Sequence, residues 1–244
     1  MERIHFIPFP YAGSSVMVYS RWRTKLPDFV ELHLIELAGR GSRLNEPFYE
    51  HMEQAVTDLE AALPRAIMEE PFVLFGYSMG SIIAYELALR LQEKHGRSPL
   101  YLYMGARRAP HAPESSPPIH HLPADAFRRE VLKLGGMTAE VFDNELWAET
   151  FLPILRADLK LAERYRPDPA AQRPPLRTNM RLFAGKEDVI PLEHMKAWQP
   201  YVTGTCELTV YDGGHFFIHQ YEDDILQTIS NDLFHYAEKR KISP

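Results

Sequence analysis

The hydrophobic pattern of the chain alternates between short apolar runs and longer stretches with apolar residues at helical spacing. Six apolar runs are predicted to be strands, over residues 4–9, 30–37, 72–75, 100–104, 180–184 and 206–211. Helical spacing predicts helices between and after them, over 16–26, 50–68, 81–91, 192–198 and 216–236. Because strands and helices alternate, the pattern predicts an α/β fold with a mostly parallel central sheet and helices on both faces.

This alternation stops after the fourth predicted strand. A proline-rich loop at 109–118 leads to three helical patterns, over 124–134, 138–142 and 145–165, with no strand between them. An excursion of about 60 residues is longer than an ordinary connection, and such excursions often form lids or binding elements. We therefore expect a single domain over residues 1–244 with a lid insertion at about 108–170. The alternative is a separate small helical domain.

The third predicted strand runs directly into the pentapeptide Gly76-Tyr-Ser-Met-Gly80, and a helical pattern follows it. A G-x-S-x-G sequence between a strand and a helix is typical of a sharp turn that exposes a nucleophilic serine above the sheet. The two glycines remove side chains that would collide in such a turn. The pattern predicts Ser78 as a nucleophile, whereas an ordinary turn serine would need neither flanking element.

A serine nucleophile needs a general base and a carboxylate that orients the base. The loop after the predicted strand at 180–184 carries Glu187 and Asp188, and the loop after the strand at 206–211 carries His215. The order Ser78, Asp188, His215 is that of α/β-hydrolases and differs from the order in chymotrypsin and subtilisin. We expect His215 as the base and Asp188 as its partner, with Glu187 as the alternative acid.

An oxyanion intermediate would need backbone N–H donors beside the serine. In α/β-hydrolases one donor is the residue after the nucleophile, here Met79, and the second comes from the loop after the first strand. That loop is Pro8-Phe-Pro-Tyr-Ala-Gly-Ser-Ser15. We expect Tyr11 to supply the second N–H, with Ala12 as the next choice. The alternative for this loop is an ordinary strand–helix turn.

Composition narrows the possible partners and the cellular location. The formal net charge of −6 argues against nucleic acid as the main partner. The single cysteine, Cys206, excludes an intrachain disulfide and fits a reducing compartment. The first residues lack the apolar core of a signal peptide, and no run of residues is long and apolar enough to span a membrane. We expect a cytoplasmic monomer.

No cofactor or metal site is expected from the motifs. His215 and His219 are four residues apart, but no neighbouring carboxylate or cysteine completes a metal-ligand set. Gly39-Arg-Gly41 lacks the third glycine of a dinucleotide fingerprint. Three basic clusters have two possible roles, as solvated surface or as a docking surface for an acidic partner: Arg107 with Arg108, Arg128 with Arg129, and Arg40 with Arg43.

The sequence as a whole resembles the type II thioesterases associated with nonribosomal peptide and polyketide synthases. The resemblance spans nearly the whole chain and includes the insertion: it rests on Pro8-Phe-Pro-Tyr-Ala-Gly13, Glu36-Leu-Ala-Gly-Arg-Gly41, residues 71–80, Arg108-Ala-Pro110, His121-Leu-Pro123, Leu134-Gly-Gly136, Leu152-Pro-Ile-Leu-Arg-Ala-Asp158, Gly185-Lys-Glu-Asp188 and Gly213-Gly-His215. The sequence departs from the family at Tyr77, where many relatives have His, and at Tyr11, where Phe is frequent.

The resemblance implies a serine thioesterase that hydrolyses acyl groups from the phosphopantetheine arm of acyl or peptidyl carrier proteins, clearing stalled or misprimed synthases. It implies Ser78, Asp188 and His215 as the triad, Tyr11 and Met79 as the oxyanion hole, and the insertion as the lid. Two alternatives remain at this level. One is a broad-specificity carboxylesterase or lipase that acts on small acyl substrates, and the other is a non-catalytic module that binds carrier proteins.

Overall fold

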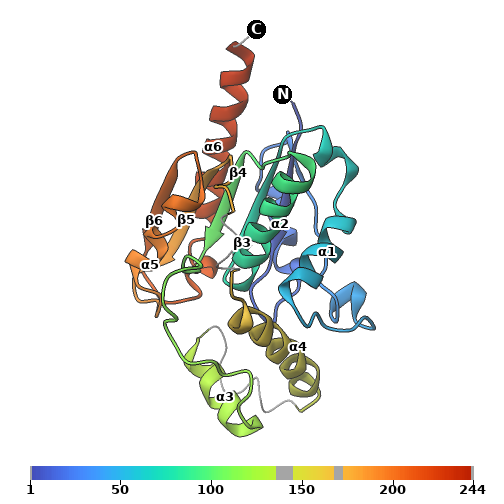
Figure 1. Cartoon of the computed structure of the whole chain (residues 1–244), viewed down its shortest axis with the longest axis vertical. Coiled ribbons are helices and arrows are strands. Elements are labelled where there is room, and N and C mark those ends of the chain that lie inside the picture. The colour runs from blue at the N-terminus through green and yellow to red at the C-terminus, as the bar shows by residue number, and fades with distance from the viewer. Residues whose placement is uncertain (1, 136–144, 168–172, 243–244) are drawn as a thin grey trace.

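The computed structural model describes residues 2–135, 145–167 and 173–242, and one sheet organises them. Six parallel strands lie in the order β2-β1-β3-β4-β5-β6, and Figure 1 labels β3 to β6. The strands are β1 (Ile4–Phe9), β2 (Val30–Leu32), β3 (Phe72–Tyr77), β4 (Tyr101–Gly105), β5 (Asn179–Gly185) and β6 (Cys206–Tyr211). The predicted α/β fold with a parallel sheet is confirmed, and each strand begins within one residue of its predicted start.

The strand order reverses direction beside β1, because the chain first adds β2 on one side of β1 and then β3 on the other. In open parallel sheets, ligands bind at such a switch point, outside the carboxyl ends of the strands, where the loops diverge. The loops that follow β1 and β3 therefore border the expected binding crevice. These loops carry Tyr11 and Ser78.

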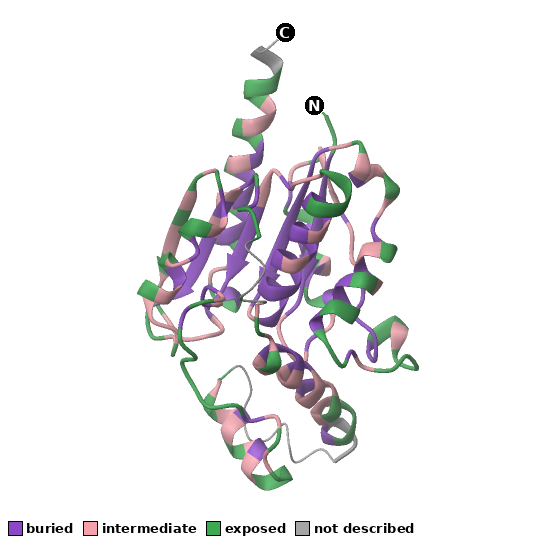
Figure 2. Ribbon diagram, viewed as in Figure 1, coloured by how far each residue is buried: buried purple, intermediate pink, exposed green. Residues whose placement is uncertain are grey.

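Helices cover both faces of the sheet, and the four central strands β1, β3, β4 and β5 are mostly buried between them (Figures 1 and 2). The edge strands β2 and β6 are more accessible. One face packs against α1 (Met52–Ala62), α2 (Met79–His95) and α5 (Leu192–Lys196). The other face packs against the 3₁₀ helix η1 (Val16–Thr24) and α6 (Glu222–Ile242). No helix in the described ranges is long and apolar enough to cross a membrane.

The insertion lies between β4 and β5 and contains α3 (Ala124–Lys133) and α4 (Glu145–Arg164). Both helices lie beyond the carboxyl ends of the strands (Figure 1). Phe127 and Val131 of α3 pack against Leu155 of α4, and Ala12 from the loop after β1 joins this cluster. Leu161 of α4 belongs to the core cluster that α1, α2 and α5 form on one face of the sheet. The insertion is thus packed onto the α/β domain through α4.

Several predicted boundaries were wrong. The first helix is a 3₁₀ helix, and Pro64 separates α1 from the short 3₁₀ helix η3 (Arg65–Met68). The strand predicted over 30–37 ends at Leu32. The Glu36 carboxylate accepts hydrogen bonds from the N–H groups of Val16 at 3.1 Å and Leu37 at 3.1 Å, so this segment caps η1 instead of extending β2.

The closing helix also differs from its prediction. The closing segment predicted as one helix over 216–236 begins as the 3₁₀ helix η6 (Phe217–His219), and α6 starts only at Glu222. The helix predicted over 138–142 lies outside the described residues.

A buried ion pair fixes α4 to the loops of the sheet. The Arg40 guanidinium donates to Asp158 Oδ2 at 2.5 Å and Oδ1 at 2.6 Å, and each side chain is only 4% exposed. Asp158 Oδ2 also accepts the N–H of Gly13 at 2.7 Å, while Arg40 donates to the carbonyl of Ser14 at 3.1 Å. The pair therefore joins the turn after β2, the loop after β1 and the insertion.

In two of the three basic clusters, arginines are buried or held in ion pairs within the protein. Arg40 is buried in the pair just described, and Arg43 forms ion pairs with Glu46 and Asp58. Arg108 is buried and pairs with Glu114, and it also donates to the carbonyl of Ala109 at 3.2 Å. These guanidinium groups hold loops together, so the hypothesis that Arg107 and Arg108 dock an acidic partner is wrong for Arg108.

We expect Asp158→Asn to lower the free energy of unfolding by about 3–5 kcal/mol, because it leaves the charge of Arg40 buried without a counter-ion. Urea unfolding followed by circular dichroism measures the loss. Glu53→Gln is the matched control, since Glu53 pairs with Arg90 but is 77% exposed. Such surface pairs contribute about 0–1 kcal/mol. Equal losses in the two variants would contradict the structural role given to the buried pair.

Candidate active site

Ser78 occupies a sharp turn between the end of β3 and the start of α2. Its backbone has φ 53° and ψ −111°, a conformation that residues other than glycine rarely adopt. The N–H of Ser78 donates to the carbonyl of Gly105 at 2.8 Å, which ties the turn to the neighbouring strand β4. Strained backbone of this kind persists where the surroundings over-determine it, as at functional sites. The predicted strand–serine–helix turn is therefore present.

The two motif glycines are required by close approach of backbone segments. A Cβ atom at Gly76 would lie 2.2 Å from the carbonyl oxygen of Gly80. A Cβ atom at Gly80 would lie 2.1 Å from the carbonyl oxygen of Phe9 and 2.7 Å from that of Pro10. All three distances are shorter than the contacts that real Cβ atoms make. The first turn of α2 is thus pressed against the loop that follows β1.

His215 lies between Ser78 and Asp188, within hydrogen-bonding distance of both. Its Nε2 atom is 3.0 Å from Ser78 Oγ, and its Nδ1 atom is 2.9 Å from Asp188 Oδ2 and 3.1 Å from Asp188 Oδ1. The Asp188 side chain is 2% exposed and that of His215 is 19% exposed. The structure brings together the three residues that the sequence singled out. In this arrangement the carboxylate fixes Nδ1 as the protonated nitrogen and leaves Nε2 able to accept a proton.

The choice between Asp188 and Glu187 is decided by the backbone. The N–H of Glu187 donates to the carbonyl of Gly213 at 3.0 Å, and its side chain is exposed. The next residue, Asp188, consequently turns inward to His215. A Cβ atom at Gly185 would lie 2.5 Å from the carbonyl oxygen of Gly213, so the missing side chain at Gly185 lets the loop of the acid approach the loop of the base.

Tyr77, one of the residues that departs from the family pattern, supports the His215 loop directly. Its hydroxyl donates to the backbone carbonyl of His215 at 2.6 Å, and its side chain is fully buried. Burial raises the pKa of Tyr77 well above its usual range, so the hydroxyl stays protonated and keeps donating. The aromatic ring also lies edge-on to the imidazole of His215, with the ring centroids 6.2 Å apart.

The expected oxyanion-hole donors come from two segments that are in contact. Met79 is the first residue of α2, where backbone N–H groups have no partner within the helix. Tyr11 lies in the loop that approaches Gly80 through Phe9 and Pro10. The Tyr11 hydroxyl is 3.2 Å from Nε2 of His219, which links this loop to the segment after His215. Tyr11 and Met79 are therefore the sequence neighbours of Pro10 and Gly80, which form this close approach, and their role as oxyanion-hole donors stays a prediction.

Sequence patterns did not reveal the groups that support the site. The contacts of Tyr77 with His215, of Tyr11 with His219 and of Asp158 with Gly13 join residues more than 130 positions apart. Tyr77 and Tyr11 lie in segments that the sequence singled out, but no local pattern indicated the partner of either hydroxyl. Only their meeting at the carboxyl edge of the sheet indicates a role.

Fold and site together define a class of protein. A parallel sheet with a serine on a strand–turn–helix elbow, followed in chain order by an aspartate and a histidine at the ends of later strands, is the architecture of the α/β-hydrolases. Comparison with known proteins identifies a family within this class. The family model described as "Thioesterase domain" matches residues 5–233, and the chain belongs to this family.

Individual relatives cover most of the chain. It is 34% identical over 233 residues to "Linear gramicidin dehydrogenase LgrE" of Brevibacillus parabrevis, covering 93% of this chain and 87% of that protein. Among solved structures, ClbQ from the colibactin NRPS/PKS pathway superposes with a TM-score of 0.88 at 29% identity, covering 96% and 98% of the two chains. The type II thioesterase BorB from the borrelidin biosynthetic cluster superposes with a TM-score of 0.84 at 31% identity, covering 95% and 93%.

We expect Tyr77→Phe to lower kcat about tenfold with little change in KM. The variant keeps the buried ring but leaves the backbone carbonyl of His215 without its hydrogen-bond donor, which costs about 1–3 kcal/mol. The loop that holds His215 is then less well fixed, so the imidazole is less often in position to act as the base. Steady-state kinetics on an acyl thioester measure the change. Tyr103→Phe, in the same buried aromatic cluster on β4, is the control and should retain kcat. An unchanged kcat in Tyr77→Phe would exclude a positioning role for this hydroxyl.

Proposed function

We propose that this protein is a serine thioesterase that hydrolyses acyl groups from the phosphopantetheine arm of carrier proteins. The observation that carries the proposal is the line of hydrogen-bonding distances from Ser78 through His215 to Asp188, formed at an elbow on the carboxyl edge of the sheet. Membership of the thioesterase domain family agrees with a thioester as the bond that is cleaved.

In the first half of the reaction, Nε2 of His215 takes the proton of the Ser78 hydroxyl as the oxygen attacks the thioester carbonyl. The N–H groups of Tyr11 and Met79 donate to the oxyanion of the tetrahedral intermediate. When the intermediate collapses, the carbon–sulfur bond breaks and the pantetheine thiol leaves with the proton from His215. Asp188 stabilises the imidazolium that exists between these two proton transfers.

In the second half, water takes the place of the thiol. His215 removes a proton from the water as its oxygen attacks the acyl-serine, and the same two N–H groups hold the second oxyanion. Collapse of this intermediate returns the proton to Ser78 Oγ and releases a carboxylic acid. The enzyme needs no cofactor for either half, since the substrate brings its own phosphopantetheine arm.

The carrier-bound substrate is inferred from the relatives and from the insertion. BorB is named as a type II thioesterase of a biosynthetic cluster, and ClbQ belongs to an NRPS/PKS pathway. In this chain α3 and α4 lie beyond the carboxyl ends of the strands, where Ser78 is located (Figure 1). Asp158 of α4 accepts the N–H of Gly13, in the same loop as the expected oxyanion donor Tyr11. We infer that the insertion acts as a lid over the acyl chain.

An oxidoreductase activity has little support in this chain, although LgrE is named as a dehydrogenase. Dinucleotide-binding folds use a Gly-rich loop directly after a strand. The loop after β1 is Pro8-Phe-Pro-Tyr-Ala-Gly13, and the turn after β2 has only the two glycines of Gly39-Arg-Gly41. Neither segment offers the three-glycine fingerprint, so hydrolysis is the activity that we propose.

Ser78→Ala should abolish hydrolysis of an acyl-carrier substrate, lowering kcat by roughly 10⁴-fold or more, because Ser78 Oγ is the only hydroxyl of the described residues that lies within hydrogen-bonding distance of Nε2 of His215. Mass spectrometry of the carrier protein measures the release of the acyl group. The fold should survive, with an unchanged circular dichroism spectrum, and a fluorophosphonate probe should label the wild type but not the variant. Undiminished turnover in Ser78→Ala would exclude Ser78 as nucleophile, and a wild type that the probe does not label would favour a non-catalytic binding module.

Substrate preference separates a thioesterase from a broad esterase or lipase on the same scaffold. We expect kcat/KM to be higher for an acyl-carrier protein than for the same acyl group on CoA, and higher for either than for a p-nitrophenyl ester. The physical reason is that docking of a protein partner adds contacts that a free ester lacks. Parallel assays with one acyl chain on all three substrates measure this order. A preference for the free ester would support the esterase alternative.

A further inference from the structure

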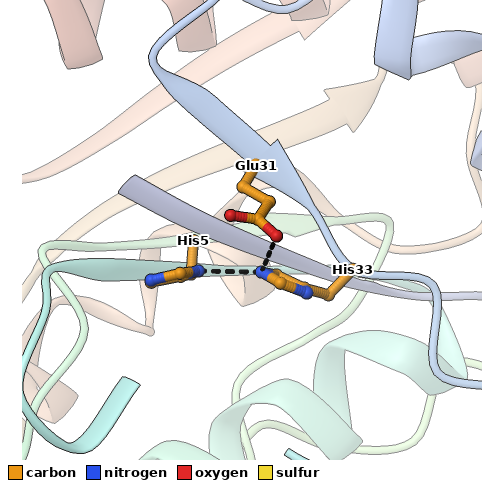
Figure 3. A group of neighbouring side chains, drawn as sticks. All are labelled: His5, Glu31 and His33. Carbon is orange, nitrogen blue, oxygen red and sulfur yellow. Dashed lines mark hydrogen bonds and ion pairs between the residues drawn. The ribbon is translucent and has the colours of Figure 1, made fainter. Parts of the chain in front are cut away.

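A second cluster of chemistry-bearing side chains lies at the opposite edge of the sheet from Ser78. His5 is near the amino end of β1, Glu31 is its register partner on β2, and His33 follows directly after β2. Alternate residues of a strand point to the same face, so Glu31 and His33 share the face onto which His5 points. Figure 3 shows the three side chains converging. The sequence indicated no metal site here, because these residues belong to two separate strands.

The potential ligand atoms of this cluster are close together. Nδ1 of His5 lies 2.8 Å from Nε2 of His33, and that atom lies 3.9 Å from Oε1 of Glu31. The second carboxylate oxygen of Glu31 accepts from Arg3 at 2.9 Å, which orients Oε1 toward the histidines. One nitrogen from each imidazole and one carboxylate oxygen thus lie within 4.8 Å of one another.

These atoms fit a divalent transition metal better than calcium or magnesium. Zn²⁺ binds imidazole nitrogen and carboxylate oxygen at about 2.0–2.2 Å, so neighbouring ligand atoms of a tetrahedral site are roughly 3.3 Å apart. The 2.8 Å between the two imidazole nitrogens and the 3.9 Å from His33 to Glu31 bracket this value, and changes of about half an ångström would bring both to it. Calcium and magnesium prefer sets made of oxygen alone. Three protein ligands leave one tetrahedral position for water.

The surroundings supply two further properties of a metal site. Nε2 of His5 lies 3.0 Å from Oε2 of Glu70, so the carboxylate holds the proton on Nε2 and leaves Nδ1 free to bind a cation. Metal-binding histidines usually have such a carboxylate partner on the second nitrogen. The cluster also borders a surface cleft of about 510 Å³, lined by Arg3, His5, Glu31, His33 and Glu70 among others, which gives an ion a path to the ligands.

We propose that His5, Glu31 and His33 form a site for a divalent transition-metal ion of the zinc type, with Glu70 orienting His5. The ion takes the place of the proton shared by His5 Nδ1 and His33 Nε2, and His33 then carries its proton on Nδ1. Binding would clamp the three-residue edge strand β2 to β1. The site is independent of hydrolysis at Ser78.

Zinc binding to the chelator-treated full chain tests the proposal. Isothermal titration with ZnCl₂ should give one ion per chain, and Co²⁺ should produce the visible absorption bands of a tetrahedral site. Saturating zinc should raise the Tm by on the order of 5 °C, since an ion that binds only the folded state stabilises it. His33→Gln and Glu31→Gln should lose the absorption bands and the rise in Tm, and Glu31→Gln serves alone if His33→Gln does not fold.

Two matched controls make the result specific. Glu70→Ala should weaken zinc binding roughly tenfold or more through the loss of the partner of His5, while Glu69→Ala, at the exposed neighbouring position, should not. His95→Gln removes another histidine–carboxylate pair, that with Glu60, and should bind zinc like the wild type. Wild type that binds no zinc, or ligand variants that bind it as tightly as the wild type, would overturn the proposal and leave the cluster as a hydrogen-bonded chain.

Discussion

The buried pair of Arg40 and Asp158 is the interaction on which the arrangement of the active-site loops depends. A charge taken out of water must be paired and hydrogen-bonded, so these two groups can be buried only in a narrow range of geometries. Asp158 shares its carboxylate with the N–H of Gly13, and Arg40 also binds the carbonyl of Ser14. The insertion is thereby coupled to the very loop that carries Tyr11. A displacement of α4 would therefore disturb the loop that carries Tyr11.

A second constraint acts from the other side of the same loop. The backbone at Phe9 and Pro10 lies so close to Gly80 that no side chain fits between them. The strained turn at Ser78 is held by this contact and by the hydrogen bond to Gly105. The nucleophile, the helix after it and the loop after β1 therefore form one rigid unit. Such rigidity is what electrostatic stabilisation of an oxyanion requires, because donors that are already in place need no reorganisation during the reaction.

The parallel sheet places the predicted catalytic residues and the His5–Glu31–His33 cluster at opposite ends of its strands. Carboxyl ends of all six strands meet at one edge, where the loops hold Ser78, Asp188 and His215 beneath the insertion. Amino ends meet at the other edge, where His5 and Glu31 are register partners. A metal ion at that edge would affect the stability of β2 without touching the reacting groups. The two sets of residues do not interfere with each other, because they lie at opposite ends of the same strands.

The sequence by itself determined the order of strands and helices, the strand–serine–helix turn, and the chain order of Ser78, Asp188 and His215, because these depend on local periodicity and on motifs within a few residues. It could not determine where β2 ends, that Arg108 and Arg40 are buried, or that Tyr77 and Asp158 support the site. Those outcomes depend on groups far apart in the chain: Glu36 leaves the sheet to cap η1, and Tyr77 reaches a carbonyl 138 residues away. Local pattern specifies elements, whereas only their packing decides which polar groups meet.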